Sequence, residues 1–481
     1  MSESNADSQR WAAEDARGLG RRLVGGVGSQ IVTLLIYFAR TLLIVPFFIT
    51  AHGVDGFADW AKLVATANIL AAIALGQFVY YGYHIRTAYA ARDTDNMNYW
   101  IACNNAFHFY IFVLTLSCLV GVLTVIDLRS ILNLQYLGRV EAAAVLALLV
   151  FSMLGQSYRD TLRAVYTAHG EFTRSEIIRS IGIALITGGS IVALIMGLPV
   201  LAVAIIHALI VPGFVCATAL VDFARRYPDV RFTMSWRIPA PSRARLDSLV
   251  AHAVPNFTDS VLQFGPTMLL GVFGVASELV VQFNLARTAL GVLRARLVAR
   301  IFAVEMTRQR VQEDWRGFRR LHWLGAIAVG VFAGGLFGAL TAFWPFFLPL
   351  WTAGAIRPDM LLFLLLAIDS TVVNVSEHSG SLLRFGGQIG VVARYATLTA
   401  IFVAVFGISA LAYADLYWMV AAFIVANAVF FHLLPPFALQ RRIPQATVPV
   451  SLLVPPLAAA ATAPLAYGAM EFCLWLWSRL A

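Results

Sequence analysis

The 481-residue chain is 60% hydrophobic and only 13% charged, and its mean hydropathy of +0.77 lies far outside the usual range of soluble domains. Its net charge of +9 does not indicate nucleic-acid binding, because the basic residues stand in short segments between apolar stretches, as topology signals do in membrane proteins. Four isolated cysteines, without CxxC or Cys/His spacing, indicate neither a metal site nor a disulfide framework.

From the N-terminus, the first 24 residues are polar and basic, and the apolar stretch after them is too long for a signal peptide. We therefore expect this stretch to remain as the first of about 13 transmembrane helices in an all-α polytopic membrane protein, since each stretch reaches the roughly 20 residues that span a bilayer. The predicted spans are 25–50, 57–83, 107–126, 140–162, 177–197, 199–222, 247–273, 277–303, 320–343, 359–383, 388–411, 414–437 and 449–477.

The basic residues predict the orientation of these spans. Twenty-eight of the 35 Lys and Arg residues fall on one side, which the positive-inside rule assigns to the cytoplasm together with the N-terminus. Adding or removing a span before the twelfth would move the later basic clusters to the opposite side. The predicted outer loops are short, which leaves no room for an extracytoplasmic catalytic domain. We expect a multi-pass protein of the bacterial inner membrane.

An internal repeat divides the chain. The first and seventh spans both start on the predicted inner side and end in a tight glycine-containing turn, ITAHGVDGF and GVFGVASEL. This pattern predicts two parallel six-helix bundles around a central cavity. The predicted divisions are a basic cytoplasmic N-terminus (1–24), an N-terminal lobe (25–223), a basic linker (224–246), a C-terminal lobe (247–437) and an accessory membrane segment (438–481), which forms either one span or a proline-containing hairpin.

Ionisable residues within the spans are the candidate functional residues, because each costs roughly 2.5–3.5 kcal/mol in mid-membrane and normally faces a wet cavity or a partner. Guanidinium groups keep their charge and bind phosphate oxygens as a fork, which suits an anionic substrate; alternatively, Arg287 pairs with Asp259 and only fixes packing. Two carboxyl groups of the tenth span could carry a coupling proton or simply bind neighbouring helices. The predicted substrate-binding residues are Arg40, Arg287, Lys62 and Asp259, and the predicted ion-coupling residues are Asp369 and Glu377.

Prolines and glycines within the spans have structural interpretations. Pro46, Pro255 and Pro266 each remove a backbone hydrogen bond and predict bent helices at the start of each half. Gly330, Gly334 and Gly338 stand four residues apart in the ninth span, a spacing that permits close helix contact.

Two regions of the chain, one in each half, resemble the polysaccharide and oligosaccharide flippases of the multidrug/oligosaccharidyl-lipid/polysaccharide (MOP) exporter superfamily. In ARTLLIVPFFITAHGVDGFADW (39–60) an arginine of the first span is followed by a proline and by Gly-x-x-Gly-x-x-x-Trp; the AIALGQFVYYGYHIRTAYAARD that follows also resembles that family. HAVPNFTDSVLQFGPTMLLGVFGVASELVVQFNLARTALGVL and IFAVEMTRQ are similar to its seventh and eighth spans and the segment after them. Ala74 departs from the family, whose members often have an acidic residue there.

The resemblance implies a flippase that moves a polyprenyl-pyrophosphate-linked oligosaccharide to the outer leaflet by alternating access, for surface polysaccharide biosynthesis. The implied partners are this lipid-linked substrate, the bilayer and polysaccharide polymerase or assembly enzymes; we expect no nucleic acid, cofactor or catalytic residues. A multidrug exporter of the same superfamily is one alternative. A membrane-embedded polysaccharide polymerase or ligase is another, but such enzymes usually need a sizeable outer loop for catalytic residues, and the predicted outer loops are short. No Walker A, HExxH or GxSxG motif is present.

Overall fold

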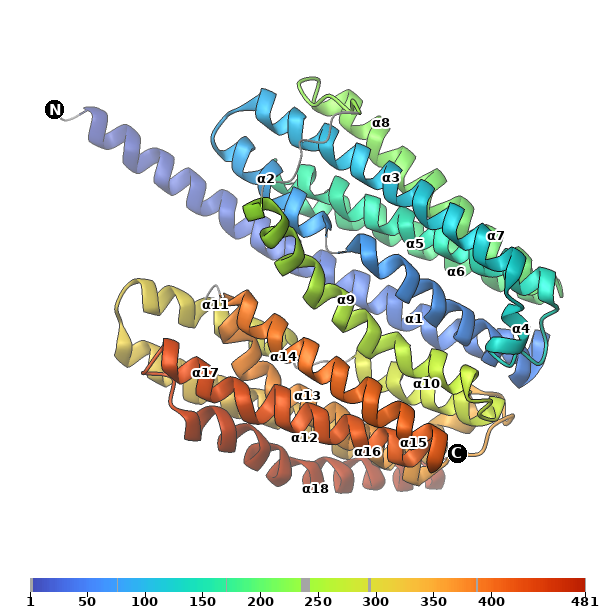
Figure 1. The fold of residues 1–481 in the computed structure, drawn as a ribbon. Helices are drawn as coiled ribbons and strands as arrows, with labels where there is room; N and C mark the ends of the chain where they lie inside the picture. Colours follow the sequence, from blue (N-terminus) through green and yellow to red (C-terminus); the bar gives the residue numbers. More distant parts are fainter. Residues whose placement is uncertain are drawn as a thin grey trace. The chain divides into compact units, whose positions relative to one another are not determined.

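The structure, a computed structural model, describes residues 3–75, 77–169, 171–234, 243–292, 296–385 and 388–480. All regular elements in these ranges are helices (Figure 1). Ten helical stretches are long and apolar enough to cross a membrane, which confirms the predicted class of all-α polytopic membrane protein. Residues 235–242 of the predicted linker and the side chains of the predicted basic N-terminus lie outside the described part.

The first half of the chain forms the elements up to the end of the sixth predicted span. They are α1 (Glu3–Leu75), α2 (Gln77–Ala90), α3 (Thr94–Val125), α4 (Leu128–Ile131), α5 (Arg139–Ala168), α6 (Phe172–Ile195), α7 (Val200–Ala208), the π-helical segment η1 (Leu209–Cys216) and α8 (Ala217–Arg226).

The second half forms the remaining elements. They are α9 (Arg243–Val272), α10 (Ser277–Val292), α11 (Arg296–Val311), α12 (Trp315–Trp351), α13 (Met360–Phe385), α14 (Ile389–Phe402), the π-helical segment η2 (Val403–Gly407), α15 (Ile408–Tyr413), α16 (Leu416–Ala426), the π-helical segment η3 (Asn427–Leu433), α17 (Leu434–Arg442) and α18 (Val448–Leu480).

These elements form two compact units. Unit 1 comprises Met1–Ala51, Ile73–Ile126 and Ala143–Leu249, and unit 2 comprises His52–Ala72, Asp127–Ala142 and Val250–Ala481. Two stretches of the predicted N-terminal lobe, His52–Ala72 and Asp127–Ala142, belong to unit 2 together with the C-terminal half of the chain. The core of unit 1 includes Tyr166 and Phe223, whose rings lie 4.4 Å apart.

The turn predicted after the first span is present within α1. Gly53 has φ 72° and ψ −179°, outside the helical region, so that two helical stretches meet there. The left-handed φ is accessible to glycine at little cost, which explains why the chain turns at this residue. The second stretch, from His52 to Ala72, belongs to unit 2.

The glycine spacing of the ninth span produces the predicted close contact, and its partner is α18. A Cβ atom on Gly330 or Gly334 would collide with the backbone carbonyl of Pro455 or Ala459, respectively, and one on Gly338 with that of Ala463. Only glycine permits this approach of α12 to α18. The last predicted segment is therefore one continuous helix packed along α12, despite its internal prolines, and not a hairpin.

Prolines also alter the winding of two spans. Pro212 lies within η1, and Pro435 and Pro436 lie in the first turn of α17, separated from the end of η3 by one residue. Proline lacks the N–H that an α-helix needs and crowds the preceding turn, which accounts for the wider local winding. In unit 2, η3 contributes Asn427 and Phe431 to the wall of a cavity.

Candidate functional site

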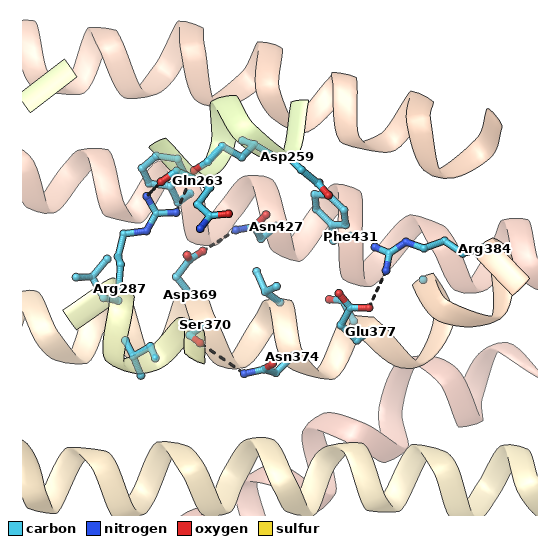
Figure 2. A pocket seen from close by; sticks show the side chains of 18 residues that line it. Asp259, Gln263, Arg287, Asp369, Ser370, Asn374, Glu377, Arg384, Asn427 and Phe431 are labelled. Atoms are coloured by element: carbon cyan, nitrogen blue, oxygen red, sulfur yellow. Dashed lines mark hydrogen bonds and ion pairs between the residues drawn. The ribbon is translucent and has the colours of Figure 1, made fainter. Parts of the chain in front are cut away.

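A polar cavity of about 180 Å³ lies within unit 2, among α9, α10, α13, α16 and η3 (Figure 2). Hydrophobic side chains such as Phe423 and Phe431 form part of its wall. Its polar and charged lining residues are Asp259, Gln263, Arg287, Asp369, Ser370, Asn374, Ser376, Glu377, Arg384 and Asn427. Such a concentration of charge inside helices that are otherwise apolar marks a site that excludes lipid and admits water or ligand.

Arg287 is positioned by the backbone of α9. Its Nη2 donates to the Leu262 carbonyl and its Nη1 to the Gln263 carbonyl, both at 3.0 Å. Because Pro266 has no N–H, the Leu262 carbonyl lacks its ordinary partner within the helix and is available to accept this bond. The guanidinium carbon also lies 5.3 Å from the centre of the Phe283 ring and 5.8 Å from that of Phe423. Two backbone carbonyls of α9 and two aromatic faces thus hold the Arg287 guanidinium at the cavity wall.

Asp369 is bound from the opposite wall. Asn427, the first residue of η3, donates its side-chain amide to Asp369 Oδ1 at 2.7 Å. The wider winding of η3 carries both Asn427 and Phe431 on the face that lines the cavity. Figure 2 shows Asp369, Asn427, Gln263 and Arg287 together at one end of the cavity.

Glu377 lies toward the other end, eight residues after Asp369 on α13, or about 12 Å along the helix axis. Arg384 Nη1 contacts Glu377 Oε2 at 3.0 Å, and the Ser381 hydroxyl donates to the same oxygen at 3.3 Å. Glu377 is buried, whereas Arg384 is partly exposed. The cavity therefore has two polar ends joined by α13, each with an arginine and at least one carboxylate.

The opposite side of α13 carries a buried histidine pair. His378 Nε2 lies 3.0 Å from His322 Nδ1, and His322 Nε2 lies 3.2 Å from the Ser451 hydroxyl of α18. These contacts connect α12, α13 and α18 within unit 2. His378 is thus a packing neighbour of the cavity and does not line it.

The structure places the predicted site residues in three regions. One cavity is lined by four of them: Asp259, Arg287, Asp369 and Glu377. Asp259 and Glu377 are far apart in the sequence, which gave no direct sign that the four residues share a cavity. Arg40 lies in unit 1, half-buried and within electrostatic range of His207. Lys62 is fully buried in unit 2 and contacts Asp59 and Asn133.

Sequence reasoning missed several lining residues. Gln263, Asn374 and Asn427 are polar side chains in apolar spans, and their unusual setting was the signal that could have identified them. Arg384 directly follows the tenth predicted span, where a basic residue is an ordinary topology signal, and only the fold reveals its contact with Glu377. Among the described residues, no three His, Cys, Asp or Glu side chains could together hold a metal ion.

The fold is similar to that of solved membrane transporters. An inward-facing multidrug resistance MATE family transporter of the MOP superfamily aligns with a TM-score of 0.66 and 12% identity over 87% of this chain and 99% of that one. The MATE multidrug transporter DinF-BH gives 0.60 and 14%, over 87% and 94%. A MOP superfamily transporter from Pyrococcus furiosus gives 0.52 and 13%, over 92% and 96%.

Neither a protein-family model nor a curated protein matches the sequence. The structural matches cover nearly the whole of the transporters concerned, and none of these three is described as an enzyme. The chain is therefore a multi-pass membrane protein with the fold of MATE-type transporters of the MOP superfamily.

Proposed function

We propose that the protein is a flippase that moves a polyprenyl-pyrophosphate-linked oligosaccharide across the bacterial inner membrane by alternating access. The observation that carries this proposal is the membrane-embedded cavity in which Arg287 lies beside amide and carboxylate groups. Guanidinium suits phosphate oxygens, and planar polar side chains suit sugar hydroxyls. The resemblance of residues 39–60 and of the seventh and eighth spans to such flippases supports the same substrate.

The size of the cavity limits what it holds. Its volume of about 180 Å³ is below the roughly 300–1,000 Å³ of pockets that enclose a drug-sized ligand. We infer that it receives one part of the head group at a time, while the lipid tail stays in the bilayer. Arg287 and Asp259 are the proposed contacts in unit 2, and Arg40 is the proposed contact in unit 1. Lys62, the remaining predicted contact, is buried against Asp59 and Asn133 in unit 2.

We further propose that Asp369 and Glu377 couple transport to protons. Each carboxylate accepts a hydrogen bond from a side chain on the cavity wall, Asn427 or Arg384. Protonation would weaken the attraction of Glu377 for Arg384 and turn Asp369 from a pure acceptor into a donor. Transport that is unchanged in vesicles without a proton gradient would remove this part of the proposal.

The main test is the sidedness of labelled polyprenyl-pyrophosphate oligosaccharide in membrane vesicles from cells with and without the protein. We expect accumulation on the cytoplasmic face only when the protein is missing. Arg40→Ala and Arg287→Ala should each abolish complementation of a flippase-null strain at normal protein level, whereas Arg357→Ala, which removes an exposed arginine, should not. Normal surface polysaccharide with Arg40→Ala and Arg287→Ala would contradict the assignment.

A multidrug exporter is the second candidate, and one observation favours it. Three acidic side chains, Asp259, Asp369 and Glu377, line the cavity against two arginines, and an acidic excess suits a cationic drug. DinF-BH, which has this fold, is described as a multidrug transporter, and the Pyrococcus furiosus transporter is described as having a binding pocket of reverse polarity that suggests a different function. A drug-sensitivity profile that changes on deletion, with normal surface polysaccharide, would select this candidate.

A further inference from the structure

We propose that Asp59 and Lys62 form a latch that closes the predicted outer end of unit 2 and must release before the cavity opens to that side. The latch consists of these two residues and the backbone of residues 132–137. The inference rests on the proposed transport function for its role, but its structural part can be tested without any substrate.

The Asp59 carboxylate accepts hydrogen bonds from backbone N–H groups of the segment between α4 and α5. Its Oδ2 accepts from the N–H groups of Tyr136 and Leu137 at 2.8 and 3.0 Å, and its Oδ1 from that of Gln135 at 3.2 Å. The Asp59 side chain is 0% exposed. One charged group thus fixes three successive residues that form no helix or strand of their own.

Lys62 binds the same segment with the opposite charge. Its Nζ donates to the Asn133 carbonyl at 2.9 Å and lies 3.6 Å from Asp59 Oδ1, and the residue is 1% exposed. The two side chains stand three residues apart on α1, so they meet on one face of the helix. Together they bind both N–H and C=O groups of residues 133–137.

The C-terminal end of α9 and the turn after it also pack closely against this segment. A Cβ on Gly271 would lie 3.0 Å from the Leu132 carbonyl and 3.1 Å from Lys62 Cδ, and one on Gly274 would lie 2.9 Å from Asn133 Nδ2. Residues 132–133 therefore lie between α1 and the turn that joins α9 to α10. His52 Nδ1, at 2.9 Å from the Tyr136 hydroxyl, extends the contact.

A charged pair is an unusual choice for permanent packing. Taking two ions out of water carries a large desolvation cost, and apolar side chains of similar volume often stabilise such a position as well or better. The charged pair has an advantage only if the contact also opens, because Asp59 and Lys62 would then be solvated by water on the outer side. This difference between the two states is the argument for a latch over a fixed structural contact.

The latch shares α9 with the cavity. Asp259, Leu262 and Gln263 line the cavity, and Gly271 lies eight residues beyond Gln263, about 12 Å along the helix. Pro266, which frees the carbonyl that Arg287 binds, lies between them. A ligand that displaced Arg287 from these carbonyls would change α9 on the side of the latch, so the geometry provides a physical route from the cavity to the outer end.

The first experiment measures whether the latch excludes solutes. Ser370→Cys places a thiol in the cavity, and a membrane-impermeant maleimide is added to intact cells; peptide mass analysis separates position 370 from the four natural cysteines. We expect slow labelling with the latch intact, and labelling at least ten times faster with Asp59→Ala or Lys62→Met. Unchanged labelling in either variant, when present at normal level in the membrane, would overturn the latch.

Asp127→Asn is the matched control. Asp127 stands just before α4, close in sequence to the latch segment but outside it, and caps that helix by accepting from the Arg129 N–H and the Ser130 hydroxyl. The bond from Ser130 is the main reason that the pKa of Asp127 lies below its ordinary value. Because asparagine caps helices about as well as aspartate, this variant should label like the parent. Faster labelling of this variant would mean that a change near the segment is enough to open it, which would also overturn a specific latch.

A second experiment fixes the latch closed and does not depend on a destabilised variant. His52→Cys and Tyr136→Cys, whose parent side chains touch, are joined by a cleavable thiol cross-linker. We expect transport of the lipid-linked oligosaccharide to stop on cross-linking and to return on cleavage, and full transport in the cross-linked protein would overturn the latch. If the protein without cross-linker moves no such lipid while the labelling result holds, the substrate proposal fails and the latch stands.

Discussion

Two hollows among membrane-spanning helices, the polar cavity of unit 2 and a larger apolar pocket of unit 1, differ in chemistry. The cavity of unit 2 is the smaller, about 180 Å³, yet it is lined by three carboxylates and two guanidinium groups. The pocket of unit 1 is about 540 Å³ and lies among α3, α5, η1 and α8, with Phe109, Phe112 and Phe151 in its wall. Among the described residues that line it, none is Asp, Glu, Lys or Arg.

The few polar groups of the unit 1 pocket serve the helices themselves. The Tyr158 hydroxyl donates to Asn105 Oδ1 at 3.2 Å, and His108 contacts the Asn104 carbonyl and the Ser157 hydroxyl. In unit 2 the charged groups instead face a shared space. Volume is therefore a poor guide to the site of action in a membrane protein, where the cost of charge makes chemistry the better one.

The largest effect is expected from Arg287→Ala. This change removes one of the cavity's two guanidinium groups, together with the hydrogen bonds that it donates to the Leu262 and Gln263 carbonyls. Hydrogen bonds to charged groups are worth about 1.5–3 kcal/mol, which corresponds to a loss of transport of about 10- to 100-fold. The vesicle sidedness assay measures it. A variant that keeps full transport would place the substrate elsewhere and break the comparison between the two hollows.

A matched pair of phenylalanines tests the comparison directly. Phe431 lines the unit 2 cavity and Phe112 lines the unit 1 pocket. We expect Phe431→Ala to lower transport about tenfold through lost contact with the substrate, because one well-packed contact is worth about 1.4 kcal/mol. Phe112→Ala should change transport less than about twofold at equal protein yield. The reverse order of effects would make the apolar pocket the transport site.

Two buried glutamates provide a finer test. Glu377 pairs with Arg384 in the cavity, and Glu176 of unit 1 pairs with Arg163 at 3.2 Å and Arg179 at 3.4 Å. We expect Glu377→Gln to alter the dependence of transport on the proton gradient with little loss of stability, since Arg384 is partly exposed. Glu176→Gln should lower thermal stability and leave that dependence unchanged. If both substitutions changed the dependence on the proton gradient equally, Glu377 would have no specific role in coupling.

The smallest effect is expected from Tyr158→Phe, which deletes one hydroxyl from the unit 1 pocket. Its bond to Asn105 is an ordinary neutral hydrogen bond, so its loss should cost about 1 kcal/mol of stability. A small fall in the thermal unfolding midpoint of purified protein, with unchanged transport, would agree with a purely structural role. A loss of transport without a change in midpoint would show that polar groups act in both hollows.

The spans were predictable because a bilayer imposes length and apolar composition on every helix that crosses it. Asp259, Arg287, Asp369 and Glu377 were predictable as functional candidates because mid-membrane charge is rare and costly. Their common cavity was not, because it depends on how α9, α10 and α13 pack.

Local backbone detail accounts for the rest of what sequence reasoning missed. Arg287 contacts carbonyls of α9, a preference that Pro266 makes possible but does not by itself predict. The bond from Asn427 to Asp369 joins two helices that are distant in sequence, and hydropathy gives no signal of this pairing. Lys62 lies against an irregular segment whose path is not encoded by any periodic pattern.

The glycine face of α12 has a consequence for how the protein is made. Gly330, Gly334 and Gly338 leave a groove along α12 that α18 fills. Since α18 follows α12 in the chain, this groove is exposed to lipid until α18 has been inserted. A chain stopped before Val448 would keep the groove open, and membrane quality-control proteases would meet an unfinished unit 2. Insertion of α18 is thus the step that covers the glycine face of α12 and completes this part of unit 2.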